Sequence, residues 1–573
     1  MLLHLLPHAF SSGKLLNQKP SLWFHSALLT LLLPATLSAQ TINMVWQDVF
    51  GGTNEERCHT MQPTSDSGFI VVGRTWSNND DLADAEYLRQ ALLIKYDANG
   101  NRQWHKTYGG SSTDHSFYTE QLPDGNYLMA LESQSTDGDV PENNGNQDFV
   151  WLKLDSVGNI IGEIVYGASL HDHPSCMRRT SAGNYIMVGG SLSNDGIVTG
   201  HHGSSDYFDI WVVMLDANGN WMWGKQIGGS FMDFSDWVQE TPDGNFLITG
   251  ETHSNDGDFP DHHGSTDYSD VFVIKMDPNG NILWKKIMGG DKDDLGEVIA
   301  LTPDGGFAVV GNSASNNGDV TNPHGGYDAW LIKCDANGNI QWQKTYGGSD
   351  ADYGHYVITT LDGGYALACE SGSNDDDLTS NKGGTDHWFL KLDSDGDIEW
   401  QVSYGGSGDD AANAVIQATS GGFIVGGTAH SDDGDPETHH GAAENGDTWV
   451  YKLVRSGRPL PVPTGDVFGF PASISDHENK TALSENLNGI DVSVYPNPAA
   501  DYLAVSFYTT QSTTFRFELI NADGMTVRST GEKNYAEGKH RISYDLSDLP
   551  VGNYLLRITT DEETNLRKVE VMR

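Results

Sequence analysis

The chain has 573 residues, of which 79 are Asp or Glu and 33 are Lys or Arg, so that its formal charge is −46. This charge repels phosphate backbones and anionic lipid headgroups, and it argues against nucleic acid as a partner. The sequence holds 66 glycines, and a tenth of its residues are aromatic. This composition favours short strands and many turns, and the length favours at least two domains, so an all-β protein is expected.

The N-terminal region has the pattern of a secretory signal. Lys14 and Lys19 precede an apolar stretch at 27–33, and the pair Ser38-Ala39 follows. We therefore expect residues 1–39 to be a signal peptide. The stretch is shorter than the roughly 20 residues of a transmembrane helix, and no later segment reaches that length. An exported protein without a transmembrane segment is predicted.

A repeated unit fills most of the chain. Its marker is a Gly-Gly doublet, once Gly-Ala, and successive doublets lie 58 or 61 residues apart. The doublets begin at Gly51, Gly109, Gly167, Gly228, Gly289, Gly347 and Gly405. Five residues after each doublet begins stands an acid: Glu56, Asp114, Asp172, Asp233, Asp294, Asp352 and Asp410. Six copies also carry a Trp five residues before the doublet, as at Trp46. This period indicates a repeat architecture.

Each unit has the pattern of four short strands, called a to d here. In the fifth copy they are expected near 298–302, 307–311, 329–334 and 339–346, with tight Gly-containing turns between a and b and between c and d. The seventh copy ends after its strand c, at 448–453, while 43–50 is a strand d with no unit before it. Pairing these two segments closes a ring, which predicts a seven-bladed β-propeller of four-stranded blades over 40–457.

The repeat resembles a known bacterial family. The doublet followed by acids, the Asp-Gly turn and the strand Asp386-His-Trp-Phe-Leu-Lys-Leu-Asp393 are similar to the β-propeller repeats called SBBP. The resemblance covers roughly 43–455 and implies a propeller, but no particular activity. The first copy departs from it, because Gln90 stands where the other copies place an Asp at the start of strand c.

The repeat stops after residue 457. Residues 458–489 are rich in Pro, Ser, Asn and Asp and are expected to be a linker. Alternating strands follow in 490–573 and predict a small Ig-like β-sandwich. This segment resembles the type A sorting domain of the type IX secretion system of Bacteroidetes, through Tyr495-Pro-Asn-Pro498, Asp523-Gly524 and Leu546-Ser-Asp-Leu549. The resemblance implies the type IX machinery as a partner and an extracellular or outer-membrane surface location after Sec export.

In a propeller, the b-to-c and d-to-a connections share one face, and here both carry many acids. Most b-to-c loops hold an acidic cassette of the form Asp-Gly-Asp, whose carboxylates and Gly turn suit Ca²⁺. The candidate metal ligands are Asp137, Asp139, Asp256, Asp258, His262, His263, Asp433 and Asp435. The alternative explanation, which we favour, is that these acids bond the amides of their own turns. Calcium is the one cofactor that the pattern suggests.

Histidine and arginine residues depart from the repeat. His201-His202, His262-His263 and His439-His440, with His324, occupy only some b-to-c loops, and imidazoles beside carboxylates suit Zn²⁺ or Cu²⁺. Ordinary polar loop residues are the alternative. Arg178-Arg179 either meet an anionic ligand or neutralise neighbouring acids. By contrast, the acid and the Trp present in nearly every copy are expected to be structural.

Sequence motifs of common enzymes are missing: the chain has no HExxH, GxSxG, GxxxxGK[ST] or GxGxxG. The pattern therefore favours a monomeric binding or scaffold protein, not an enzyme, that engages a glycan or protein through its acidic loop face. A secreted hydrolase or lyase with carboxylates on the same face is the alternative. A structural surface-layer component, with no site, is the third interpretation.

Overall fold

The computed structural model describes residues 41–455, apart from 141, 379, 419–421 and 443–444, together with the strands between 492 and 571 and a few residues beside them. The expected signal peptide at 1–39 and the linker at 458–489 lie outside the described residues. Nearly all described elements are β-strands. No helix among the described residues is long and apolar enough to cross a membrane.

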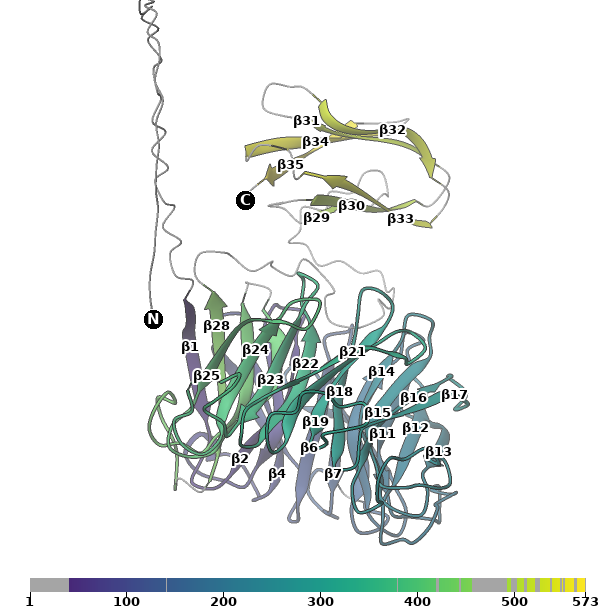
Figure 1. Cartoon of the computed structure of the whole chain (residues 1–573), viewed down its shortest axis with the longest axis vertical. Helices are drawn as coiled ribbons and strands as arrows, with labels where there is room; N and C mark the ends of the chain where they lie inside the picture. The colour runs from purple at the N-terminus through teal and green to yellow at the C-terminus, as the bar shows by residue number, and fades with distance from the viewer. Residues whose placement is uncertain are drawn as a thin grey trace, which may run out of the picture. The chain divides into compact units, whose positions relative to one another are not determined.

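Seven four-stranded antiparallel sheets make up the described part of residues 42–455 (Figure 1). The first four sheets each follow sequence order. They are β2 (Glu56–Pro63), β3 (Phe69–Thr75), β4 (Gln90–Tyr96) and β5 (Arg102–Tyr108); β6 (Asp114–Gln121), β7 (Tyr127–Ser133), β8 (Asp148–Leu154) and β9 (Ile160–Tyr166); β10 (Asp172–Arg179), β11 (Tyr185–Ser191), β12 (Asp209–Leu215) and β13 (Trp221–Ile227); and β14 (Asp233–Glu240), β15 (Phe246–Thr252), β16 (Asp270–Met276) and β17 (Ile282–Met288).

The remaining three sheets repeat this order with one exception. They are β18 (Asp294–Leu301), β19 (Phe307–Ser313), β20 (Asp328–Cys334) and β21 (Ile340–Tyr346); β22 (Asp352–Thr359), β23 (Tyr365–Ser371), β24 (Asp386–Leu392) and β25 (Ile398–Tyr404); and β26 (Asp410–Gln417), β27 (Phe423–Ala429) and β28 (Asp447–Arg455) with β1 (Ile42–Phe50). A short 3-10 helix, η1 (Asp80–Leu82), lies between β3 and β4. The four strands of each unit thus agree with the sequence prediction.

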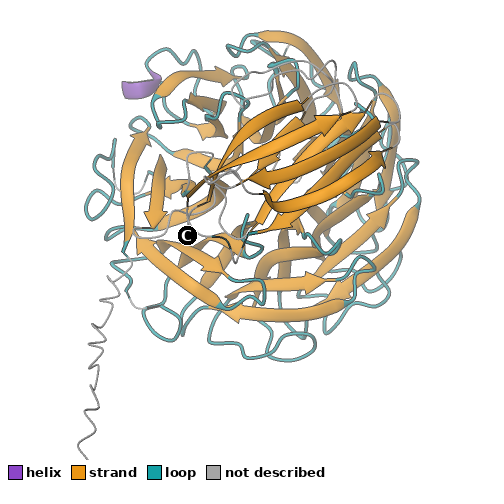
Figure 2. Cartoon of the chain, turned by 90° about the horizontal axis from the view of Figure 1, so that it is seen from above, coloured by secondary structure: helices purple, strands orange, loops and turns teal. Residues whose placement is uncertain are grey.

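Strand β1 supplies the fourth strand of the last sheet, as its sequence predicted. It pairs antiparallel with β28, from Ile42 opposite Arg455 to Phe50 opposite Thr448. Each sheet contacts the next, and β2 of the first sheet contacts β26 and β27 of the last. The sheets follow one another around a ring (Figure 2). No sheet of this ring is left with only three strands in the described residues.

Strand a of each sheet lies on the inside of the ring, because the seven a strands contact one another in succession (Figure 2). In the fifth copy it begins at Asp294, four residues earlier than the sequence suggested, and its pairing shifts register between Gly296 and Val298. The same shift occurs in all seven a strands. Such a bulge bends the strand and re-aims one side chain.

The core lies between successive sheets. Val, Ile, Leu and aromatic side chains of strands b and c are almost entirely buried, whereas strand d alternates between half-buried and exposed residues. The largest fully buried side chains include one Trp of strand c in four sheets: Trp211, Trp330, Trp388 and Trp449. Trp46 on strand d packs on Phe69 of the first sheet, with ring centroids 6.1 Å apart. The Trp found in six copies therefore packs between sheets, as predicted.

The C-terminal strands form two sheets around a separate apolar core. One sheet has the order β29 (Val492–Tyr495), β30 (Tyr502–Thr509) and β33 (Gly538–Asp545). The other has the order β32 (Thr526–Tyr535), β31 (Thr513–Ile520), β34 (Gly552–Thr560) and β35 (Thr564–Val571). The alternation in the sequence thus predicted this all-β unit, although its Ig-like topology remains a prediction.

Candidate ligand-binding face

The acidic cassettes fasten one loop to another. Asp137 accepts hydrogen bonds from Ser111 N at 2.7 Å and Ser111 Oγ at 2.8 Å, and Asp256 accepts the same pair from Ser230 at 2.7 and 2.6 Å. Asp433 accepts a hydrogen bond from Ser407 N at 2.7 Å. In each case a b-to-c loop holds the d-to-a loop of the same junction. The sequence suggested that these acids bond the amides of their own turns as the alternative to a metal site, whereas the bonds described here join two different loops.

The second acid of each cassette also bonds the doublet. The amide of Asp139 donates to Gly109 O at 2.9 Å, and its Oδ2 accepts Gly109 N at 3.2 Å. Asp258 and Asp435 repeat both bonds, with Gly228 and Gly405 respectively. A lysine lies beside each of these two acids: Lys285 at Asp258 and Lys382 at Asp435.

The histidine pairs lie against the Asp that begins strand c. His263 N donates to Asp270 Oδ2, and its ring Nδ1 lies 3.2 Å from the same oxygen. His262 Nε2 lies 3.1 Å from Tyr268 O and 3.7 Å from Asp270 Oδ2. The other two pairs repeat this arrangement at Asp209 and Asp447. Each pair thus belongs to its own blade, and the described distances bring no two pairs together.

Among the described residues, no group of three or more His, Cys, Asp or Glu side chains has the arrangement of a metal site. The eight candidate ligands instead fall into separate loops. Asp137 with Asp139, Asp256 with Asp258, and Asp433 with Asp435 each flank a glycine of positive φ, at Gly138, Gly257 and Gly434. Calcium binding by these residues stays a prediction.

The acid that follows each doublet organises the d-to-a loop, as expected of a residue found in all copies. Oδ2 of Asp114 accepts hydrogen bonds from Gly110 N at 2.8 Å and from Ser135 Oγ at 2.7 Å. Its Oδ1 accepts a hydrogen bond from Ser133 Oγ. It is fully buried. Asp172, Asp233, Asp294 and Asp352 keep the same three kinds of bond.

The bulge of each inner strand places one side chain out of register, three residues after this acid. The seven residues, which we call the bulge ring, are His59, Phe117, Ser175, Asp236, Glu297, His355 and Asn413. All seven are half-buried. They differ in every copy except for two histidines, although the acid before them is constant. Such variation between otherwise similar repeats is expected at a ligand-binding site.

Histidines gather on one arc of the inner face around the carboxylate of Glu132. His171 Nε2 contacts Glu132 Oε1, and both His115 Nδ1 and His173 Nε2 lie 3.8 Å from Glu132 Oε2. Burial lowers the pKa of His115 to about 4. Phe117 of the bulge ring packs on His173, with centroids 4.6 Å apart. This arc combines aromatic rings with imidazoles.

Carboxylates form another arc. Asp236 and Glu297 of the bulge ring lie near Glu251 of β15. The charge of Glu297 raises the pKa of both Asp236 and Glu251, and the charge of Glu251 raises that of Asp236. Burial raises the pKa of all three groups, that of Glu251 to about 7. Asn312 donates to Glu297 Oε1 at 3.3 Å. A carboxyl group that is protonated near neutral pH can donate a hydrogen bond or a proton.

Arg178 lies beyond the bulge of β10, on the side of the a-to-b turns. Its guanidinium packs over Trp237 at 4.5 Å and over Tyr118 at 5.1 Å, and the side chain is buried. The backbone amide of Arg179 donates to Glu120 Oε1 at 2.9 Å. The guanidinium of Arg178 therefore stacks on aromatic side chains inside the ring of sheets. Such stacking was not among the roles that the sequence suggested for Arg178 and Arg179.

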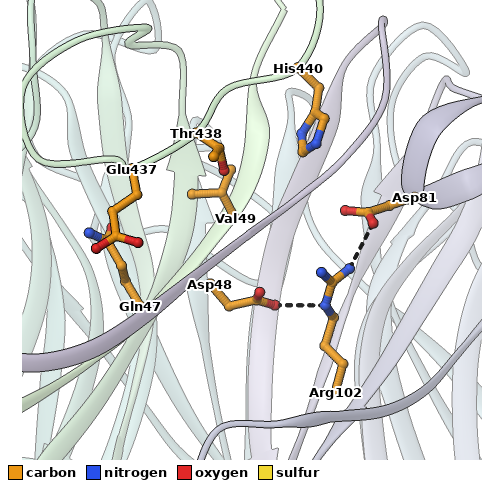
Figure 3. A pocket seen from close by; sticks show the side chains of 8 residues that line it. All are labelled: Gln47, Asp48, Val49, Asp81, Arg102, Glu437, Thr438 and His440. Carbon is orange, nitrogen blue, oxygen red and sulfur yellow. Dashed lines mark ion pairs between the residues drawn. The ribbon is translucent and has the colours of Figure 1, made fainter.

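A small polar pocket of about 210 Å³ lies where the first and last sheets meet (Figure 3). Arg102 points into it and pairs with Asp48 of β1 and with Asp81 of η1. Glu437 and His440 come from the last b-to-c loop. The first b-to-c loop, which carries Asp81, thus helps to close the ring.

The sequence did not reveal the bulge ring. Strand a was expected to begin near residue 298 in the fifth copy, so Glu297 and its equivalents were assigned to the preceding loop. A signal was nevertheless present, because positions one and three after the constant acid vary strongly between copies, as in His173 and Ser175 or Tyr353 and His355. An alignment of the seven copies at that acid displays this variation.

Three comparisons with known proteins bear on the chain. Residues 493–572 match the family model described as "Secretion system C-terminal sorting domain". The chain is 28% identical over 204 residues to the regulatory protein FlaEY of Caulobacter vibrioides, an overlap that covers 34% of this chain and 20% of that protein. The chain thus spans about a fifth of the length of this curated relative.

Among solved structures, a puromycin hydrolase is similar to the chain at 11% identity, with a TM-score of 0.38 over 80% of this chain and 59% of that one. A member of the DUF4221 family from Bacteroides vulgatus is similar at 10% identity, with a TM-score of 0.31 over 73% of this chain and 98% of that one. Residues 493–572 thus form a sorting domain, which indicates export to the cell surface or the extracellular space.

Proposed function

We propose that the chain is an exported binding protein whose residues 40–457 form a closed seven-bladed β-propeller of the SBBP type. Its ligand is an extracellular glycan or protein, and it binds over the inner part of the loop face. The Ig-like sandwich at 490–573 addresses the protein to the type IX machinery of a Bacteroidetes cell and is removed there. The mature propeller acts as a monomer.

The observation that carries this proposal is the bulge ring. Residues with a structural role recur from sheet to sheet around the ring. These are the capping acids, the Gly doublets and the Trp residues that pack between sheets. The bulge ring alone combines imidazoles, carboxylates, an aromatic ring, a hydroxyl and an amide at one register position. A ligand that contacts several blades at once would select different groups in each blade, and part of each half-buried side chain is exposed.

A second candidate function rests on the carboxylate arc. Burial raises the pKa values of Asp236, Glu251 and Glu297, and the charge of Glu297 adds to the shift of the other two. A raised pKa is what a general acid needs near neutral pH. A hydrolase or lyase that acts on an extracellular polymer would use this arc. The binding function is preferred because no enzyme motif accompanies these residues.

A binding assay with two matched sets of variants tests the proposal. The purified protein is screened against extracellular polysaccharides, their oligosaccharides and matrix proteins, first for affinity and then for turnover. For a ligand that is found, Asp236→Asn and Glu297→Gln are expected to weaken binding at least tenfold. Asp216→Asn, at a c-to-d turn on the other face, is the control and leaves affinity unchanged.

The outcomes separate the two functions. Binding without turnover, lost in the bulge-ring variants, supports a binding protein. Turnover that is lost in Glu297→Gln while affinity is retained supports the hydrolase or lyase. Equal affinity in all variants places the ligand elsewhere on the protein and contradicts the proposed site.

A further inference from the structure

Six blade junctions each bury a carboxylate oxygen without a partner. The residues are the Asp residues that begin strand c: Asp148, Asp209, Asp270, Asp328, Asp386 and Asp447. All six are fully buried, and Oδ2 of each accepts a backbone N–H from the b-to-c loop, for example from His202 to Asp209 and from Lys382 to Asp386 at 2.8 Å. Oδ1 of each is buried and has no hydrogen-bond partner.

The unpartnered oxygen faces the constant acid of the next blade. The six pairs are Asp148 with Asp172, Asp209 with Asp233, Asp270 with Asp294, Asp328 with Asp352, Asp386 with Asp410, and Asp447 with Glu56. Both oxygens converge on the first Gly of the doublet. A Cβ added to Gly167 would overlap Asp148 Oδ1 and would lie 2.9 Å from Asp172 Oδ2. Glycine is therefore required to let the two carboxyl groups approach.

The seventh junction differs in one residue. Gln90 replaces the strand-c Asp, and Asp114 lies against Gly109 of the doublet. Gln90 is 2% exposed, and its Oε1 is also buried without a partner. An uncharged amide here resembles a protonated carboxyl group in shape and charge. At the first junction the side chain that begins strand c is therefore a neutral amide. At the other six junctions it is an Asp, which is neutral only when it is protonated.

Two ionised carboxylates cannot be buried side by side without a compensating group. Oδ1 has no appreciable exposed surface, and glycine packs directly against it. A proton fits this space. We propose that Asp148 and Asp172, whose buried oxygens converge on Gly167, share one proton, which makes this junction a pH-responsive latch between two blades.

The junction at Asp148 shows which groups act on the pair. Asp148 faces Asp172 and the ring of His171, and the loop amides of Asn144 and Gly145 point at it. Burial raises the pKa of Asp148 to about 7, and the charge of Asp172 adds to this, whereas the amides and His171 oppose it. Burial also raises the pKa of Asp172, against the bonds from Ser191, Ala168 and Ser193.

The direction of the pH effect follows from these shifts. An acid whose pKa is raised in the folded state holds its proton more tightly there than in the unfolded chain. Its contribution to stability is therefore complete below the ordinary Asp pKa of 3.8 and declines as the pH rises toward about 7. Above that range this contribution to stability is lost, and both Asp148 and Asp172 carry a negative charge.

The substitution Asp148→Asn tests the latch in the full chain. The amide reproduces the protonated state, since its oxygen can accept Asn144 N and its NH₂ can donate to Asp172. We expect a melting temperature within about 1 °C of the wild type at pH 5 and higher by about 1–3 °C at pH 8. The same difference at both pH values, or a larger loss at pH 8, would overturn the proposal.

Two further measurements keep the test decisive if Asp148→Asn does not fold. Gln90→Glu adds the missing carboxyl group at the seventh junction, and it should lower the melting temperature at pH 8 but not at pH 5. Infrared spectra of the folded wild type at pH 6 should show the carbonyl band of protonated carboxylic acids. An equal effect of Gln90→Glu at both pH values, or no such band, would contradict shared protons.

Discussion

Arg102 Nε lies 3.1 Å from Asp48 Oδ2, and this ion pair joins β5 of the first sheet to β1, the strand that completes the last. The same guanidinium reaches Asp81 Oδ1 at 3.0 Å and packs over Phe50 at 5.0 Å. One side chain therefore bridges the two ends of the ring and the atypical loop of the first blade (Figure 3).

Replacing Arg102 with Ala should weaken this closure. The pair is partly exposed, so its loss is expected to lower the free energy of unfolding by only about 1 kcal/mol, with the packing on Phe50 included. Lys106→Ala on the same strand is the control and should change stability by less than about 0.5 kcal/mol. Denaturant unfolding measures both values. An equal effect of the two variants would contradict a role of Arg102 in closure.

The first Gly of each doublet should tolerate no side chain. In Gly228→Ala the new Cβ would overlap Asp209 Oδ1 and lie 2.9 Å from Asp233 Oδ2, so we expect a destabilisation of about 1–3 kcal/mol. Gly162→Ala is the matched control, because its Cβ would meet Trp151 at an ordinary 3.5 Å. A melting temperature of Gly228→Ala equal to that of the control would show that the junctions are loosely packed.

Chelation tests the calcium prediction at the cassettes. Asp137, Asp256 and Asp433 already accept loop hydrogen bonds, so we expect EDTA to leave the melting temperature within about 1 °C. Asp256→Ala should by contrast lower it, since Ser230 N loses its acceptor. A fall on chelation that added Ca²⁺ reverses would instead assign a calcium site to these loops.

The sorting domain makes a prediction about the mature protein. Mass spectrometry of the native cell surface and culture medium should find the propeller without peptides from 493–572, because we propose that the export machinery removes this domain. Peptides from the cytoplasmic fraction should include them. A surface form that retains Arg573 would contradict removal.

The sequence predicted the repeat, the four strands and the closing strand, because these depend on local alternation and on turn residues with fixed spacing. It also predicted the packing role of Trp46 and the structural role of Asp114, since both recur in other copies. Positions in space were harder to infer. The bulge between Gly296 and Val298 interrupts the alternation of strand a, so the pattern seemed to begin after it.

The candidate site was missed for this reason. Glu297 and His355 lie in the bulge itself. The bulge interrupts the alternation of side chains, so the sequence pattern does not predict on which face of the strand these two side chains lie. The junction pairs were hidden in another way. Asp148 and Asp172 lie 24 residues apart in the sequence, and each resembles an ordinary acid at the start of a strand. Only the packing of neighbouring blades brings their carboxyl groups together.

The seam between β1 and β28 has a consequence for how the chain folds. Trp449 Nε1 donates to Gln47 Oε1 at 2.8 Å across 402 residues of sequence. Contacts of such separation form slowly, so closure is the late step of folding. Until then both strands are open edges, and β1 of one molecule can pair with β28 of another. Dilute refolding should therefore favour closed monomers, while crowded refolding should favour strand-exchanged dimers.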